Sequence, residues 1–351
     1  MIQPHCFTKD WIHAQRETLG AADPEILERA IYAITLLVAL TKTDLDFVFK
    51  GGTSLLLHLP TPQRLSIDID ITCDTDRESL EEVLASILPD TPFTRFEEQL
   101  RGEHRLPKRL HYKFYYPSPI RNGQELPVLL DVVTEPNKIQ DIVQKPIELP
   151  FIDCVETTNV STPSVNALLG DKLTAFGPSS IGVPLTEKFS LQVIKQLFDV
   201  AQLYSEVTDL SIVAHANKIS YEAERSYRTE GICSYSEYLD DVINTCYDIC
   251  SIDLRGFKET DSTKLLRRGI NQLPNHLISS KFKLPQAKIA AAKAAALAIK
   301  LKHHPQSGGL PTFDTSKVAQ LKNHLIIDQF SILQRLKSIS PEAYFYWASL
   351  S

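Results

Sequence analysis

The segment from Arg64 to Thr72, RLSIDIDIT, constrains the fold of this chain more than any other. Apolar and polar residues alternate along it, with Leu65, Ile67, Ile69 and Ile71 in one phase and Ser66, Asp68, Asp70 and Thr72 in the other. A period of two is that of a β-strand, whose successive side chains point to opposite faces of a sheet. One face must therefore pack on a core, while the other carries two carboxylates.

Asp68 and Asp70 project from the same face of this predicted strand, with Cα atoms roughly 6 to 7 Å apart. Two negative charges this close repel each other unless a cation lies between them. Hard oxygen ligands suit Mg²⁺ or Mn²⁺, which in proteins commonly share their coordination with substrate phosphates. The pair predicts a metal site for a phosphate-bearing substrate. The competing interpretation is an ordinary solvated strand face.

A glycine turn lies upstream of the two aspartates. Gly51 and Gly52 separate a predicted strand, DFVFK, from a predicted helix, TSLLLHL. Glycines let the backbone approach a ligand closely, and the N-terminus of a helix offers free N–H groups to phosphates. Thr53 and Ser54 would add hydroxyl donors. A glycine turn at a helix start, followed by a same-face aspartate pair on the next strand, is a more specific sign of a metal and phosphate site than either feature alone.

A third carboxylate is expected from Asp131, in the apolar strand LPVLLDVV. An aspartate in a buried strand needs a partner or a metal ion. The alternatives are that Asp131 is tied to a turn at the strand end, or that Glu135 takes its place.

The remaining patterns predict an α+β protein with a mixed sheet, followed by a mainly α-helical part. Before residue 160 we expect a helix from Asp23 to Thr41 and two strands over 109–116 and 126–133, joined by a hairpin loop. After residue 160 the expected elements are long helices, among them 164–176, 186–204 and 287–302. The predicted domains are 1–160, a core with an N-terminal helix, and 161–351, a helical domain.

Composition narrows the class of protein. The chain has 351 residues, a net charge of -6 and 43% hydrophobic residues, which are ordinary globular values. We expect no membrane span, because no apolar run reaches about 18 residues. No secretory signal is visible and the cysteines form no metal-binding spacing, so we expect a cytoplasmic protein with reduced thiols.

Four segments resemble the AbiEii/AbiGii-type nucleotidyltransferases, the toxins of type IV toxin-antitoxin and phage abortive-infection systems. These are KGGTSL, RLSIDIDI, LLGDKLTAFGPSSIGVP and KQLFDVAQL, and the resemblance covers about residues 46 to 205. It implies a polymerase-β-like nucleotidyltransferase core followed by a helical half that completes the nucleotide site and contacts the acceptor.

The resemblance also implies roles for single residues. Gly51, Gly52, Thr53 and Ser54 would bind the triphosphate of an NTP, together with Arg64 and Ser66 of the R-x-S-x-D-x-D pattern. Asp68 and Asp70 would hold the metal. Asp131, which is expected from its own strand and not from the resemblance, could complete a second metal site or act as a base. Lys172 would contact the nucleotide phosphates, and Asp199 would be an acid near the active site.

A polar stripe on one predicted helix is independent support for a functional role of the fourth segment, KQLFDVAQL. On the predicted helix 186–204, Lys188, Gln192, Lys195 and Asp199 fall within about a 60° sector. Such a stripe can face a cleft, which would make Lys188 and Lys195 nucleotide-binding residues. The alternative is a solvated face with a Lys195–Asp199 pair.

The expected reaction is attack of an acceptor hydroxyl on the α-phosphate of an NTP, with release of pyrophosphate. The resemblance implies RNA as acceptor, at the 3′ end of tRNA, and a cognate antitoxin as partner. The segment Lys281–His304 carries six lysines and no acidic residue, and could follow a phosphate backbone. It could equally be a packing helix. The other hypotheses are transfer to a small molecule or a protein side chain, or a catalytically silent binding module.

Overall fold

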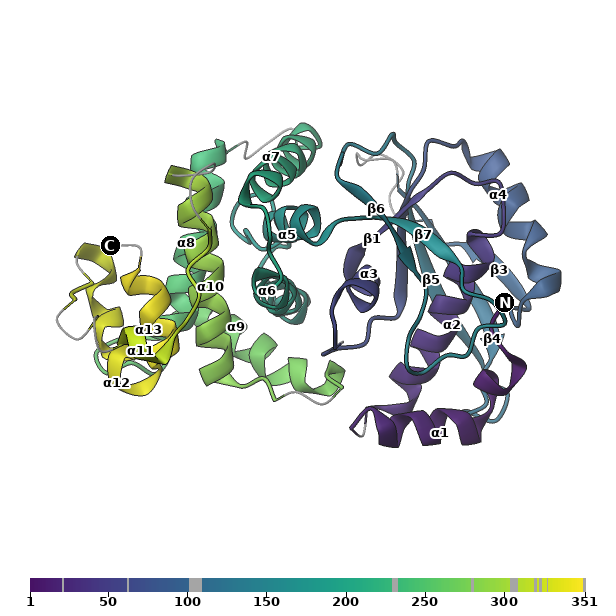
Figure 1. The fold of residues 1–351 in the computed structure, drawn as a ribbon, viewed down its shortest axis with the longest axis horizontal. Helices are drawn as coiled ribbons and strands as arrows, with labels where there is room; N and C mark the ends of the chain where they lie inside the picture. Colours follow the sequence, from purple (N-terminus) through teal and green to yellow (C-terminus); the bar gives the residue numbers. More distant parts are fainter. Residues whose placement is uncertain are drawn as a thin grey trace. The chain divides into compact units, whose positions relative to one another are not determined.

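The computed structural model describes the chain except for residues 21, 62, 101–108, 229–232, 279–280, 304–308, 319–320, 322–323, 327 and 350–351, and the side chains of 317, 318 and 328. It divides into two compact units. The sheet unit comprises Met1–Ser164 and Asn275–Ser280, and the helical unit comprises Val165–Pro274 and Lys281–Ser351. The α+β class is confirmed, with a mixed sheet first and helices after it (Figure 1).

The sheet unit is built on a five-stranded sheet, in the order β1-β2-β5-β4-β3. These strands are Val48–Lys50, Asp68–Thr72, Glu125–Val133, Arg109–Pro117 and Arg95–Glu98, named in that spatial order. The pair β2 and β5 is parallel, and the other neighbours are antiparallel. The strands predicted over 109–116 and 126–133 are confirmed as β4 and β5.

One face of this sheet carries the core. Ile69 and Ile71 of β2 are fully buried, as are Leu130 and Val132 of β5. The helix α2, Pro24–Leu40, packs against β2 and β5 and is buried along most of its length (Figure 1). Asp23 caps it as predicted, since its carboxylate accepts from the backbone N–H of Glu25 at 2.9 Å. The opposite phase of each strand leaves polar residues outside this core.

Further elements complete the sheet unit. They are the α-helices α1 Lys9–Thr18, α3 Gly51–His58 and α4 Arg77–Ser86, the strand pair β6 Ile142–Pro146 and β7 Asn159–Pro163, and the 3-10 helices Pro4–Phe7 and Leu88–Asp90. The returning segment around Leu277 bridges Arg64, and β2 begins only at Asp68, four residues after the start of the alternating pattern.

The helical unit centres on α10, Leu284–His303, which contacts α6, α8, α9 and α13. Its elements are α5 Val165–Thr174, α6 Ser190–Tyr204, α7 Leu210–Ser226, α8 Tyr235–Ser251, α9 Asp261–Gln272, α10, α11 Thr315–Val318, α12 Leu336–Ile339 and α13 Pro341–Ala348, with a 3-10 helix at Asp328–Arg335. Another 3-10 helix, Leu273–His276, lies where the chain passes to the returning segment. Among the described residues, no helix is both long enough and apolar enough to cross a membrane.

Candidate active site

Gly51 and Gly52 directly follow β1 and form the first residues of α3, which thus begins two residues earlier than predicted; Gly51 touches Asp70. Gly51 has φ +79°, a left-handed backbone that side chains other than glycine rarely adopt. A Cβ atom on Gly51 would lie 1.9 Å from Oδ2 of Asp70, so the carboxylate rests directly against the glycine. Lys50 gives the helix no side-chain cap. The N-terminus of α3 therefore begins beside a carboxylate that only a glycine can accommodate.

Gly52 is equally close to two other predicted residues. A Cβ atom there would lie 2.7 Å from Nη2 of Arg64 and 3.1 Å from Oγ of Ser66. The structure thus brings Gly52, Arg64 and Ser66 together at the start of α3. A guanidinium group and a helix N-terminus both attract anions, so this corner of the sheet unit suits a phosphate.

The parallel pairing of β2 with β5 brings the third carboxylate to the other two. Asp70 and Asp131 are partners in register, and Asp68 stands opposite Leu129. All three aspartates are half-buried and lie in the strand phase that points away from the buried core residues. Three hard oxygen donors on one face fit Mg²⁺ or Mn²⁺ in ligand type.

Glu135 was the alternative third carboxylate, and the structure gives it a different position. It follows the end of β5, outside the ladder with β2, and forms an ion pair with Lys138 at 3.0 Å. Asp131 is the acid that the register places beside Asp70.

His111 is the residue that the sequence analysis missed. It is the register partner of Asp131 on the other side, in β4, and its Nδ1 lies 2.7 Å from Oδ1 of Asp131. The side chains of His111 and Asp131 are 14% and 32% exposed. Alternation in the sequence puts His111 on the same strand face as Lys113 and Tyr115, but the register that sets it opposite Asp131 comes from the structure.

Thr53 and Ser54 are buried, and their hydroxyl groups form hydrogen bonds within the protein. Oγ1 of Thr53 donates to the carbonyl oxygen of Asp68 at 2.5 Å, and Oγ of Ser54 donates to that of Gly51 at 2.9 Å. These bonds tie α3 to β2 and close its first turn. The expectation that both hydroxyls donate to a triphosphate is therefore not supported, and the backbone N–H groups remain for that purpose.

Lys172 and Asp199 meet inside the helical unit. Lys172 of α5 lies 3.1 Å from Oδ2 of Asp199 in α6, with side chains 8% and 0% exposed. Nζ of Lys172 also lies 3.5 Å from Oε1 of Gln196. A buried ion pair is costly to desolvate, and removing one partner leaves an uncompensated charge, so the two residues act as a pair.

The comparison with protein families decides the assignment. Residues 35–306 match the family described as nucleotidyl transferase AbiEii toxin, type IV TA system, which is more than half of the chain. The chain belongs to the AbiEii family. It is thus a nucleotidyltransferase of the toxin-antitoxin class, and the resemblance seen in its sequence is confirmed.

Solved structures give weaker likenesses. JHP933 from Helicobacter pylori is 13% identical, with 78% of this chain and 92% of that chain covered and a TM-score of 0.44. MenT4, a nucleotidyltransferase toxin from Mycobacterium tuberculosis, is 14% identical, with 98% and 99% covered and a TM-score of 0.45. These scores add nothing to the family assignment. No curated protein sequence matches at a significant level.

In this AbiEii-family chain, the prediction of one continuous polar helix face from Lys188 to Asp199 is wrong. The helix α6 begins at Ser190, so Lys188 precedes it, in a turn where the N–H of Phe189 bonds Thr186. Asp199, at the other end of the stripe, is fully buried because α6 packs against α5, α9 and α10. Lys188 is exposed, and Lys195 is half-buried.

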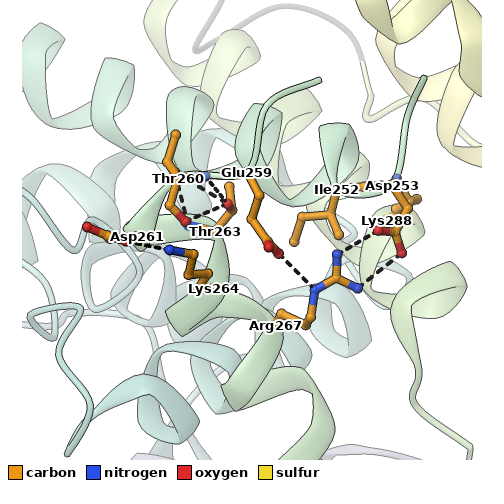
Figure 2. A network of polar contacts seen from close by, with 9 residues as sticks. All are labelled: Ile252, Asp253, Glu259, Thr260, Asp261, Thr263, Lys264, Arg267 and Lys288. Carbon is orange, nitrogen blue, oxygen red and sulfur yellow. Dashed lines mark hydrogen bonds and ion pairs between the residues drawn. The ribbon is translucent and has the colours of Figure 1, made fainter. Parts of the chain in front are cut away.

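The predicted RNA contact through Lys281–His304 stays a prediction, and only part of its lysines remain for it; Lys281 and Lys283 are exposed, and His304 itself lies outside the described residues. The helix α10 is a packing helix, as the alternative interpretation held. Nζ of Lys288 is buried and donates to the carbonyl oxygens of Cys250 and Ile252. The Arg267–Asp253 ion pair lies nearby (Figure 2). Lys293 donates to Ser205 at 3.1 Å, and Lys302 pairs with Asp240 at 2.5 Å. These three lysines are occupied within the helical unit.

A second set of metal-type ligands lies in the sheet unit, at His5, Cys6 and Asp153. The three ligand atoms lie within 4.8 Å of one another. Nε2 of His5 bonds Oδ2 of Asp153 at 2.8 Å, and burial raises the pKa of the Cys6 thiol. These bonds attach the N-terminal segment to Asp153. The ligand atoms here are a nitrogen, a sulfur and an oxygen, whereas the three aspartates offer only oxygen atoms.

Proposed function

We propose that this AbiEii-family enzyme transfers an NMP from an NTP to a hydroxyl of RNA, at the 3′ end of tRNA, in a reaction that depends on Mg²⁺ or Mn²⁺. The observation that carries the metal dependence is the register of Asp70 with Asp131 beside the Gly51 turn. Carboxylates crowded in this way favour a divalent cation.

The residues of the sheet unit have two proposed roles, cation binding and phosphate binding. Asp68, Asp70 and Asp131 hold the cation, and Gly51, Gly52, Arg64 and Ser66 receive the phosphates at the start of α3. A cation bound there would polarise the phosphoryl oxygens and lower the pKa of the attacking hydroxyl. The acceptor hydroxyl attacks the α-phosphate, its proton is lost to a base, and pyrophosphate leaves. Asp131 serves as cation ligand or as that base.

In the helical unit, a phosphate contact by Lys172 rests on the family resemblance alone, since its ammonium group is buried against Asp199. An ammonium group offsets charge that develops on phosphate oxygens. Asp199 holds Lys172 in one position through their 3.1 Å ion pair. Lys188 and Lys195, one exposed and the other half-buried, are kept only as weaker candidates for nucleotide contact.

The choice of RNA rests on the family resemblance, because three lysines of the segment Lys281–His304 are occupied within the helical unit. Membership of a toxin-antitoxin family also supports a cognate antitoxin as partner and a role in phage defence. An RNA acceptor, together with free cysteines, supports action in the cytoplasm. Small molecules and protein side chains are the competing acceptors, and the same experiment tests them.

The experiment supplies the purified enzyme with each labelled NTP, Mg²⁺ or Mn²⁺, and total RNA. We expect metal-dependent label in RNA of tRNA size. Asp70→Ala should reduce it by about 100-fold or more, since such losses follow removal of a transition-state charge stabiliser. The matched control is Asp44→Ala, which changes an exposed aspartate of the same unit. Label in protein or a small molecule, or label that survives Asp70→Ala, contradicts the proposal.

A further inference from the structure

We propose that His111 is a positioning residue, which fixes the carboxylate of Asp131 for metal binding. The inference rests on the proposed function, since it concerns the same metal site. The hydrogen bond from Nδ1 of His111 to Oδ1 of Asp131, at 2.7 Å, is its starting point.

The strand order shows how this hydrogen bond can orient the carboxylate of Asp131. Because β5 lies between β2 and β4, Asp131 has Asp70 as register partner on one side and His111 on the other. The imidazole N–H holds Oδ1 on the β4 side. Oδ2 is thus the oxygen left for a cation shared with Asp70. Without His111, the carboxylate would be free to rotate about its Cβ–Cγ bond.

Charge also favours this arrangement. Asp68, Asp70 and Asp131 share one face, and their mutual repulsion opposes keeping all three close together. A hydrogen-bond donor to Asp131 offsets part of this repulsion. Groups that hydrogen-bond metal ligands in other proteins typically change metal affinity 10- to 100-fold when removed.

An internal comparison separates this pair from an ordinary surface pair. His5 and Asp153 form the same kind of bond at 2.8 Å, but their side chains are 50% and 54% exposed. His111 and Asp131 are 14% and 32% exposed, so water competes less for their bond. His111 also stands in a sheet ladder, where its backbone cannot shift without disturbing β4 and β5.

The test measures Mn²⁺ binding by EPR titration in the presence of a non-reactive α,β-methylene NTP analogue, so catalysis is not needed. His111→Leu removes the donor, and His111→Asn restores an N–H near the place of Nδ1. We expect His111→Leu to weaken Mn²⁺ binding about 10- to 100-fold and His111→Asn to return it to within a few fold of the native value. His5→Leu, the matched control, should bind Mn²⁺ as the native enzyme does.

The outcomes separate the two proposals. If Asp70→Ala weakens Mn²⁺ binding and His111→Leu does not, the role of His111 is overturned and the metal site stands. If Asp70→Ala leaves binding unchanged, the metal site is overturned, and the role of His111 with it. Should His111→Leu fail to fold, His111→Asn still decides: a folded His111→Asn protein with weakened binding contradicts the positioning role.

Discussion

Single residues at the glycine turn set the geometry of the site. Gly51 combines a left-handed backbone with direct contact to the Asp70 carboxylate, and these two constraints have separate costs. The left-handed conformation costs about 1 kcal/mol for a residue with a Cβ atom. Contact at 1.9 Å would in addition force Asp70 to move. The glycine is therefore required by the neighbouring acid as well as by the turn.

Gly51→Ala should consequently lose both stability and activity. We expect a fall of at least about 1 kcal/mol in the free energy of unfolding and about 100-fold in nucleotide transfer, because displacement of a reacting group by about 1 Å has this effect. Gly123→Ala is the matched control, since Gly123 has φ +86° and nothing within 4 Å of a Cβ. It should lose stability alone. Equal activity in the two variants would refute the role of the contact.

At the scale of elements, α10 is a helix with several lysines that nevertheless forms part of the core of the helical unit. Its eight alanines are all buried, and the helix packs against α6, α8 and α13. Lys288 reaches past the end of α8 and donates to two carbonyl oxygens that the helix leaves unsatisfied. Burial lowers the pKa of Lys288. Its role is to complete the packing of two helices.

Lys288→Ala should therefore destabilise the helical unit by about 2 to 4 kcal/mol, because it opens a cavity and leaves buried carbonyls unpaired. Urea unfolding is followed by the fluorescence of Trp347, whose Nε1 lies 3.4 Å from Cys250, in a Trp11→Phe background. Lys283→Ala, at an exposed position, should change stability by less than about 0.5 kcal/mol. A stable Lys288→Ala protein that binds RNA more weakly would restore the nucleic-acid interpretation.

At the scale of the whole molecule, the two units are not two successive pieces of chain. The segment Asn275–Ser280 returns to the sheet unit from within the helical sequence. There the N–H of Ile278 bonds the carbonyl oxygen of Gln63 at 3.0 Å, and Ile278 joins the core of the sheet unit. This segment lies next to Arg64, which borders the glycine turn.

Ile278→Ala should thus destabilise the sheet unit, although the residue is distant in sequence. We expect a loss of about 2 to 4 kcal/mol, typical of a buried isoleucine cut to alanine. The reporter is Trp11, in a Trp347→Phe background, since Trp11 packs against the core of that unit. Asn275→Ala, at an exposed position in the same segment, is the control. If Trp11 does not respond, the segment contributes no stability to the sheet unit.

The sequence by itself determined the local features of this protein. Alternation identified β2 and the face of Asp68 and Asp70, Asp23 marked the start of α2, and the glycine pair marked the start of α3. Each of these signals depends on residues close together in the chain, where periodicity and backbone preference act directly.

Only the tertiary structure decided which distant residues meet. The parallel pairing of β2 with β5 placed Asp131 beside Asp70, and the hairpin register placed His111 against Asp131. Helix packing buried Lys288 and Asp199, which in sequence look like solvated charges. Local patterns carry no information about strand order or about which helix faces become covered, because both depend on how the whole chain buries its apolar surface.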